Sequence, residues 1–336
     1  MSARRRILPL FIPHLGCPNA CVFCNQKRIS GQKQPVTGAD VSAALESLAA
    51  DERGLELAFY GGSFTALHMD EQRELLGAAQ PFRECGVISS IRVSTRPDAI
   101  DLPRLQLLRD MGCTTIELGA QSMCDDVLAQ CGRGHTAEDT RMAAELIRQC
   151  GFCLILQMMT GLPGSSMQKD FQTAEMIRDL HPDGVRIYPS VILRDTEMYD
   201  MWQAGLYTEH TVEDAVACCA EILPIFQLAN IPVIRLGLNP TDELSGGDAV
   251  GGAYHPAFGE LVRSRILFHR ACEMFDACDS GKDAVIAVCP RELSQMIGSQ
   301  RSNICLLKDK FCLGSLKVVP DATLSPGVIK RIDELR

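Results

Sequence analysis

Short apolar, β-branched runs alternate with segments of helical periodicity over roughly the first 240 residues. The runs are Ile7–Ile12, Leu55–Tyr60, Ser90–Ser94, Thr115–Leu118, Cys153–Met159, Val185–Tyr188 and Val233–Leu236. Between them apolar residues recur at three- and four-residue spacing, as in Val41/Leu45/Leu48, Leu75/Leu76/Ala79, Leu105/Leu108/Met111, Met142/Leu146/Ile147 and Phe171/Ala174/Ile177. This alternation predicts an α/β fold in which helices cover a parallel sheet. The pattern alone does not distinguish an open sheet from a closed or partial barrel.

The pattern changes after residue 240. Residues 240–258 are rich in glycine and read as a loop across the mouth of the fold, with Tyr254 and His255 as candidate substrate contacts. A loop that is merely exposed to solvent is the alternative. Further on, the predicted elements are a strand at Ala284–Val288, helices at Arg291–Ile297 and Ser302–Phe311, and a strand at Leu316–Val319. We therefore expect two parts, a barrel over residues 1–240 and a small α+β region over 241–336.

Length and composition fit a globular α/β protein. The chain has 336 residues, of which 46% are hydrophobic, enough for a sizeable core. Its sixteen cysteines are irregularly spaced and lie mostly in apolar patterns, which predicts reduced thiols in a cytoplasmic protein. A basic start at residues 4–6 and the apolar run after it resemble a secretory signal, but Pro9 and Pro13 interrupt the run. No apolar stretch reaches the roughly 18 residues of a membrane span.

Charge is unevenly distributed. The net charge is −9, yet residues 259–336 contain 12 basic and 10 acidic residues, whereas the remainder contains 21 and 32. The acidic majority argues against a protein that coats nucleic acid with its whole surface. A local basic site within residues 259–336 is compatible with this charge distribution.

Three cysteines form a compact motif, C-x3-C-x2-C, at Cys17, Cys21 and Cys24. Three thiolates without a fourth at ligand spacing suit a [4Fe–4S] cubane that keeps one iron open. Structural zinc is an alternative, but it needs four ligands, and no C-x2-C or H-x3-H partner follows in the next hundred residues. Buried cysteines of a core are a further alternative. The pair Cys150 and Cys153 has redox spacing but no further partner, so we expect core packing there.

The cysteine motif, with Phe23 before its third cysteine, resembles the signature of the radical S-adenosylmethionine (SAM) superfamily. The resemblance implies a partial (β/α)6 TIM-type barrel, SAM bound at the open iron, and Phe23 packed against the adenine. It also implies an electron donor such as flavodoxin or ferredoxin, and homolysis of SAM to a 5′-deoxyadenosyl radical that abstracts a substrate hydrogen. The protein then supplies position and exclusion of water.

Sites on such folds form at the carboxyl ends of the strands, which directs attention to the residues that follow each run. Gly61, Gly62 and Ser63 follow the second run, and in the family a Gly-Gly motif here contacts the SAM amino group; a plain tight turn explains the glycines equally well. Arg96 and Arg133 are candidate clamps for the methionine carboxylate, with solvated surface charges as the alternative. The expected cofactor-binding residues are Phe23, Gly61, Gly62, Ser63, Ser94, Arg96, Gln121 and Arg133. No catalytic side chain is assigned.

Five ordered segments between residues 55 and 210 resemble the radical SAM domain of the Elongator catalytic subunit. They are Tyr60–Thr65, Thr95–Asp98, Glu117–Ser122, Arg133–Thr136 and Tyr188–Thr196. The cysteine spacing is instead similar to the oxygen-independent coproporphyrinogen III oxidase group, which shares the Gln121 and Arg133 positions. That group usually has Tyr, Asp and Cys where this chain has Phe11, Gln157 and Asn25. Nothing after residue 240 resembles the acetyltransferase domain of the Elongator subunit.

The stretch from Ile297 to Leu307 resembles the centre of a KH module, whose Gly-x-x-Gly turn clamps an RNA backbone. Arg301 stands where the second glycine is expected, and a βααβ appendage without RNA contact is the alternative. Three functions remain open: modification of a tRNA base, oxidation of a tetrapyrrole or other small molecule, and a non-catalytic iron–sulfur sensor or RNA-binding module. The intact SAM-binding positions, Gly61, Gly62, Gln121 and Arg133, argue against the sensor.

Overall fold

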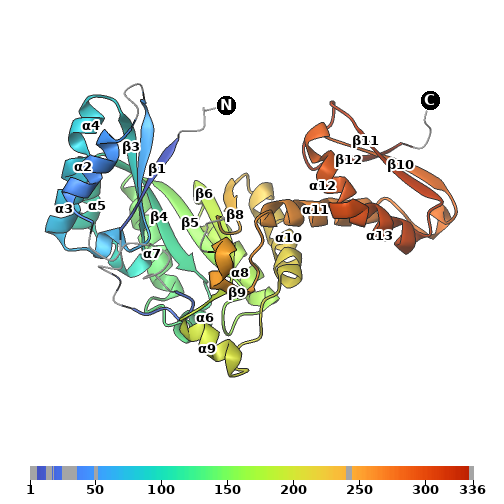
Figure 1. Ribbon diagram of the computed structural model, residues 1–336, viewed down its shortest axis with the longest axis horizontal. Helices are drawn as coiled ribbons and strands as arrows, with labels where there is room; N and C mark the ends of the chain where they lie inside the picture. The colour runs from blue at the N-terminus through green and yellow to red at the C-terminus, as the bar shows by residue number, and fades with distance from the viewer. Residues whose placement is uncertain are drawn as a thin grey trace. The chain divides into compact units, whose positions relative to one another are not determined.

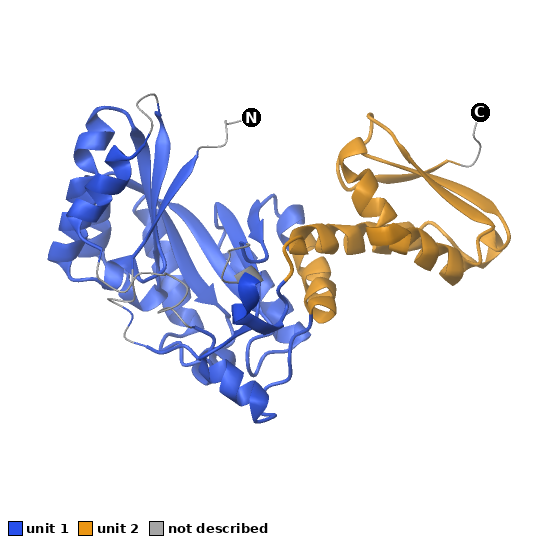
Figure 2. Cartoon of the chain, viewed as in Figure 1, with its two compact units in different colours: residues 1–211, 225–254 blue, residues 212–224, 255–336 orange. Residues whose placement is uncertain are grey.

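A computed structural model of the chain describes residues 6–12, 17, 19–24, 36–48, 52–239 and 244–332. Its contacts divide the chain into two compact units (Figure 2). Unit 1 comprises residues 1–211 and 225–254, and unit 2 comprises residues 212–224 and 255–336. Unit 1 thus extends past the boundary expected at residue 240. Helix α10 (Val212–Leu228) contributes to both units.

Unit 1 is built on a sheet of seven parallel strands in the order β1-β2-β3-β4-β5-β6-β8 (Figure 1). The strands are β1 (Ile7–Phe11), β2 (Leu55–Tyr60), β3 (Ile88–Thr95), β4 (Cys113–Gln121), β5 (Cys153–Thr160), β6 (Gly184–Pro189) and β8 (Val233–Leu236). Each of the seven predicted runs is a strand of this sheet. Among the described residues β1 pairs only with β2 and β8 only with β6, so the sheet is curled and not closed. The predicted partial TIM-type barrel is confirmed, with seven strands.

Helices connect the strands and cover the outer face of the sheet (Figure 1). They are α2 (Gly38–Glu46), α3 (Met69–Ala78), α4 (Gln80–Glu84), α5 (Leu102–Asp110), α6 (Asp125–Gln130), α7 (Ala137–Gln149), α8 (Met167–Asp179) and α9 (Glu197–Gln203). Several of these helices begin at a residue whose side chain caps the first turn. Thr136, for example, caps α7 and forms a capping box with Asp139, which satisfies backbone N–H groups that have no partner inside the helix.

The two faces of the sheet differ in polarity. On β3 the fully buried Ile91 and Val93 alternate with the partly buried Arg92, and on β4 the fully buried Ile116 alternates with Glu117. Successive side chains of a strand point to opposite faces. The apolar set therefore packs beneath the helices, and the polar set lines the concave face, where a ligand has access.

Two short strands, β7 (Val191–Leu193) and β9 (Ala249–Gly252), pair antiparallel in a separate sheet of unit 1. Part of the stretch predicted as a loop is therefore a strand. Gly252 is required here, because its φ is +81° and a Cβ would lie 2.7 Å from the carbonyl oxygen of Ser190. Residues 240–243 of the predicted loop lie outside the described residues.

Unit 2 contains a three-stranded sheet in the order β11-β10-β12, with β10 parallel to β11 and antiparallel to β12. Its elements are α11 (Phe258–Cys272), β10 (Asp283–Val288), α12 (Leu293–Ile297), α13 (Ser302–Phe311), β11 (Ser315–Pro320) and β12 (Ile329–Ile332). The predicted strand–helix–helix–strand order is confirmed, and β12 is an addition. The core of unit 2 includes Ile286, Val288, Met296, Ile304 and Leu307.

Candidate functional site

The three motif cysteines lie on the segment that follows β1. Cys21 is buried, and Cys17 and Cys24 are half-buried. None of the chain's sixteen cysteines, all of which lie in described positions, forms a disulfide. The backbone N–H of Val22 donates to the carbonyl of Cys131 at 3.1 Å, which ties the segment to the end of α6. Asn25, which stands where the coproporphyrinogen oxidase group usually has a further cysteine, lies outside the described residues.

Two buried arginines reach the cysteine sulfurs. Arg96 Nη1 lies 3.7 Å from Cys17 Sγ, and Arg133 Nη1 lies 3.4 Å from Cys21 Sγ. Arg96 is only 2% exposed and Arg133 only 7%, so the alternative of solvated surface charges is wrong for both. Each guanidinium thus places a positive charge beside a sulfur that would hold the cluster. Arg96 also donates to the backbone carbonyl of Arg133 at 2.5 Å, which joins the two groups.

The arrangement of the cysteines suits a cluster better than a single ion. Within the described ranges, no three His, Cys, Asp or Glu side chains gather closely enough to hold one metal ion. A mononuclear zinc site would need such convergence. In a cubane each cysteine binds a different iron, so the three sulfurs need not converge on one point. The set of three reduced thiols with cationic donors beside two of them therefore fits a [4Fe–4S] cluster.

The Gly61-Gly62-Ser63 turn follows β2 directly. Gly61 has φ +94°, and a Cβ there would lie 3.1 Å from the carbonyl oxygen of Ile12. Gly61 is thus needed for the turn and for the close approach of β1, independently of any ligand. Gly62 is half-buried and Ser63 is buried.

The other expected cofactor residues also lie near the carboxyl ends of strands. Gln121 adopts φ +65° at the end of β4, and its amide pairs with that of Gln157 on β5 at 2.9 and 2.8 Å. Gln157, which stands where the coproporphyrinogen oxidase group usually has Asp, therefore forms an amide pair with Gln121. Ser94 is half-buried on β3, and Phe23 is half-buried against a cluster that contains Val22.

The structure buries His135, for which the sequence patterns indicated no role, close to Arg133. Burial, reinforced by the charge of Arg133, lowers the pKa of His135 to about 4, so the ring is neutral near pH 7. One ring nitrogen, Nε2, lies 3.2 Å from the carbonyl of Ala120. The other, Nδ1, is buried without a hydrogen-bond partner in the structure. The available signal was its position next to the Arg133-Gly134 motif, which lies in the connection between α6 and α7.

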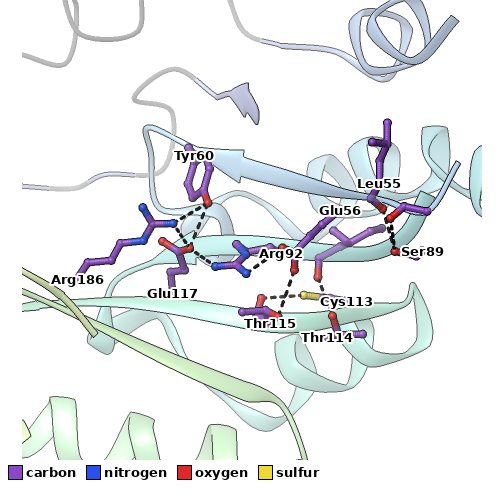
Figure 3. A network of polar contacts seen from close by, with 12 residues as sticks. Leu55, Glu56, Tyr60, Ser89, Arg92, Cys113, Thr114, Thr115, Glu117 and Arg186 are labelled. Carbon is purple, nitrogen blue, oxygen red and sulfur yellow. Dashed lines mark hydrogen bonds and ion pairs between the residues drawn. The ribbon is translucent and has the colours of Figure 1, made fainter. Parts of the chain in front are cut away.

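A charged network on the concave face was also missed (Figure 3). Glu117 accepts hydrogen bonds from Arg92 at 2.5 Å, from Arg186 at 2.8 Å and from the Tyr60 hydroxyl at 3.1 Å. Arg92 also donates to Glu56 at 2.9 Å. Burial and the charge of Glu117 hold the pKa of Tyr60 well above its usual value. The signal in the sequence that could have revealed this network was the presence of charged residues inside strongly apolar strands.

Two family models match consecutive parts of the chain. One, described as the Radical SAM superfamily, matches residues 11–177, and the other, described as the Radical_SAM C-terminal domain, matches residues 182–267. The chain belongs to the radical SAM superfamily. It is a radical SAM enzyme, and enzymes of this family use a [4Fe–4S] cluster and SAM.

Relatives of this radical SAM enzyme include tRNA-related proteins. It is 31% identical over 192 residues to "tRNA uridine(34) acetyltransferase" of Methanocaldococcus jannaschii, covering 51% of this chain and 36% of the relative. It is 33% identical over 138 residues to "Elongator complex protein 3" of Homo sapiens, covering 40% and 25%. The structure of archaeal Methanocaldococcus infernus Elp3 superposes with a TM-score of 0.62 at 24% identity, covering 82% of this chain and 64% of that one.

The radical SAM chain thus spans about a third of the length of the curated relatives it matches. The resemblance of its core to the Elongator catalytic subunit is confirmed, and so is the expected cofactor pair. No helix in the described part of the chain is long and apolar enough to cross a membrane.

Proposed function

We propose that this radical SAM enzyme modifies a base of tRNA. The observation that carries the proposal is the 31% identity over 192 residues to a relative named for tRNA uridine(34). Acetyl transfer is not part of the proposal, because the matched region covers only 36% of that relative. The C-x3-C-x2-C spacing favours a second candidate, the oxidation of a small molecule such as a tetrapyrrole.

We assign roles at the cofactor site as follows. Cys17, Cys21 and Cys24 hold the cluster, which when bound and reduced supplies the electron that cleaves SAM to the 5′-deoxyadenosyl radical. Arg96 and Arg133 lie beside the sulfurs of Cys17 and Cys21 and, in this proposal, bind the SAM carboxylate. Gly61-Gly62-Ser63, Ser94, Gln121 and Phe23 line the remaining SAM site in this proposal.

We include an RNA contact in unit 2 in the tRNA proposal. Between α12 and α13 the backbone turns through Gly298, Gln300 and Arg301 with φ of 77°, 49° and 65°. Arg301 is exposed at the start of α13, and Lys310 is exposed near its end. A basic, exposed turn at the position of the KH clamp is suited to a phosphate backbone. The KH-like role of this turn remains a prediction.

Reversing one charge in this turn tests the RNA contact. We expect Arg301→Glu to weaken tRNA binding and to reduce the salt dependence, since each lost phosphate contact removes roughly 0.7 from the slope of log K against log salt for single strands. The measurement is fluorescence anisotropy with labelled tRNA at several salt concentrations. SAM cleavage without substrate should not change, because the cofactor site lies in unit 1.

The matched control for Arg301→Glu is Lys317→Glu, which makes the same charge change at an exposed position of β11. Equal losses in both variants would mean that only overall charge matters. No tRNA binding by the unaltered protein at micromolar concentration and about 50 mM salt would end the tRNA proposal in favour of a small-molecule substrate.

The SAM site can be tested separately. We expect Gln121→Ala to weaken SAM binding roughly ten- to a hundredfold while iron content stays unchanged, because one charge-assisted hydrogen bond is worth about 1.5–3 kcal/mol. Equilibrium dialysis on the reconstituted protein measures the affinity. The control is Gln149→Ala, an exposed amide on α7. Unchanged affinity in Gln121→Ala would remove this residue from the site.

A further inference from the structure

A cavity of about 1160 Å³ lies on the concave side of the sheet in unit 1. We call it the arginine chamber, because Arg92, Arg186 and Arg235 line it together with Glu56 and Tyr60. Both edge strands, β1 and β8, contribute to its wall, so the curled sheet surrounds it. Its volume exceeds the roughly 300–1,000 Å³ of ordinary small-molecule pockets. The chamber has room for a ligand.

The arginine chamber begins beside the expected SAM contacts and extends away from them. Tyr60, which lines the chamber, directly precedes Gly61, whereas the other lining residues of β2 and β3 are Glu56 at the start of β2 and Arg92 in the middle of β3. On β4, Glu117 precedes Gln121 by four residues, about 13 Å along a strand. None of the expected cofactor-binding residues lines the chamber. A ligand in it would occupy a second site.

The charges of the arginine chamber do not balance. Arg92 is paired with Glu56 and Glu117, and Arg186 is paired with Glu117. Arg235 lies beside Arg186 in the register of β6 and β8, and the described residues provide it with no ion pair. Arginine remains charged at any physiological pH, so among the described residues three positive groups face two carboxylates. Neighbouring like charges are unfavourable unless an anion lies between them.

Hydrogen-bond donors also exceed acceptors in this network. Arg186 already donates to Glu117, to the Tyr60 hydroxyl at 3.0 Å and to the Tyr188 hydroxyl at 3.1 Å. The Nε atoms of Arg92 and Arg186 are nevertheless buried without a hydrogen-bond partner in the structure. Buried donors without acceptors are costly. Within the described part of the chain, these two donors therefore have no acceptor.

Apolar side chains also line the arginine chamber. Ile7 and Pro9 of β1 and Val233 and Ile234 of β8 line it, and Ile7 and Ile234 are 42% and 43% exposed. The guanidinium of Arg186 lies 5.6 Å from the centre of the Tyr60 ring, which adds a planar surface. A ligand that fits both the arginines and these apolar residues has an anionic end and an apolar or planar part.

We propose that the arginine chamber binds a small molecule through its carboxylate or phosphate, with the anion between Arg186 and Arg235 and the apolar part against the edge strands. This site goes beyond the proposed tRNA modification and does not depend on it. It would give the enzyme a second, small-molecule ligand beneath the SAM site.

The test uses three probes of one shape: 1-naphthoate, 1-naphthyl phosphate and the neutral 1-naphthylmethanol. Isothermal titration of the full chain at low salt should show binding of an anionic probe and at least tenfold weaker binding of the alcohol. The stronger of the two anions identifies carboxylate or phosphate as the ligand group. Arg235→Gln should weaken the anion roughly tenfold or more, as expected for one charge-assisted contact. Arg73→Gln, an exposed arginine on α3, is the control and should change nothing.

A second variant separates lost binding from a damaged fold. Glu56→Gln removes a negative charge from the wall and should tighten anion binding, a gain that a damaged protein would not show. Equal binding of alcohol and anions, or equal affinities in Arg235→Gln and Arg73→Gln, would overturn the proposal. Neither tRNA nor SAM is present in these titrations, so failure here leaves the proposed function untouched, and the reverse also holds.

Discussion

Replacing Cys17, Cys21 and Cys24 together by Ala is expected to abolish the brown absorbance of the cluster and all reductive cleavage of SAM. The three thiols are the cluster ligands expected in this family, and two of them have a guanidinium within reach of the sulfur. Alanine provides no metal ligand, so the cluster has no attachment. Anaerobic reconstitution followed by iron and sulfide assays, and chromatography of 5′-deoxyadenosine, measure the two losses.

The matched control replaces Cys150 and Cys153 by Ala. Both residues are half-buried, and burial raises the pKa of the Cys153 thiol above its usual value, which disfavours the thiolate. Iron content should therefore stay intact, at a cost in stability of about 1 kcal/mol. If iron fell to half in this control, a second cluster would have to be placed at that pair, and the single-cluster interpretation would be wrong.

Glu117→Ala is expected to lower the free energy of unfolding by about 3–5 kcal/mol, the usual effect of removing one partner from a buried ion pair. The Glu117 side chain is only 5% exposed, and it compensates both Arg92 and Arg186. Without it two guanidinium groups remain close together, with Glu56 as the carboxylate still paired to Arg92. Urea denaturation followed by circular dichroism measures the change.

The control for Glu117→Ala is Glu138→Ala. Glu138 forms an exposed ion pair with Arg141 on α7, and its side chain is 61% exposed. Exposed pairs contribute at most about 1 kcal/mol, because water screens them. A loss of stability at Glu117 no larger than the loss at Glu138 would mean that water enters the network and supplies the missing compensation.

The order and position of the strands could be predicted because they depend on local composition. A strand in a sheet that is covered by helices has to be apolar over most of its length, as β2 and β5 are. The cysteine triplet could also be predicted from the sequence, since its three ligands lie within eight residues of one another. In both cases the physical requirement acts on consecutive residues, so the sequence displays it directly.

Short elements could not be predicted in the same way. Strands β7 and β9 have three and four residues, and β9 contains two glycines and lies in a stretch that reads as a loop. These strands exist because each provides the other with backbone partners across a long separation in sequence. Strand β12 likewise forms on the edge of a sheet whose other strands precede it.

The chemistry of the concave face was decided only by the tertiary structure. Arg92 and Glu117 are 25 residues apart, Glu117 and Arg186 are 69 apart, and Arg96 meets Cys17 across 79 residues. The sequence by itself determined which residues could be charged, which strands would be buried and where three thiolates lie together. It could not determine which charges compensate one another, because that depends on the register and curl of parallel strands, and these are set by packing of the whole sheet against its helices.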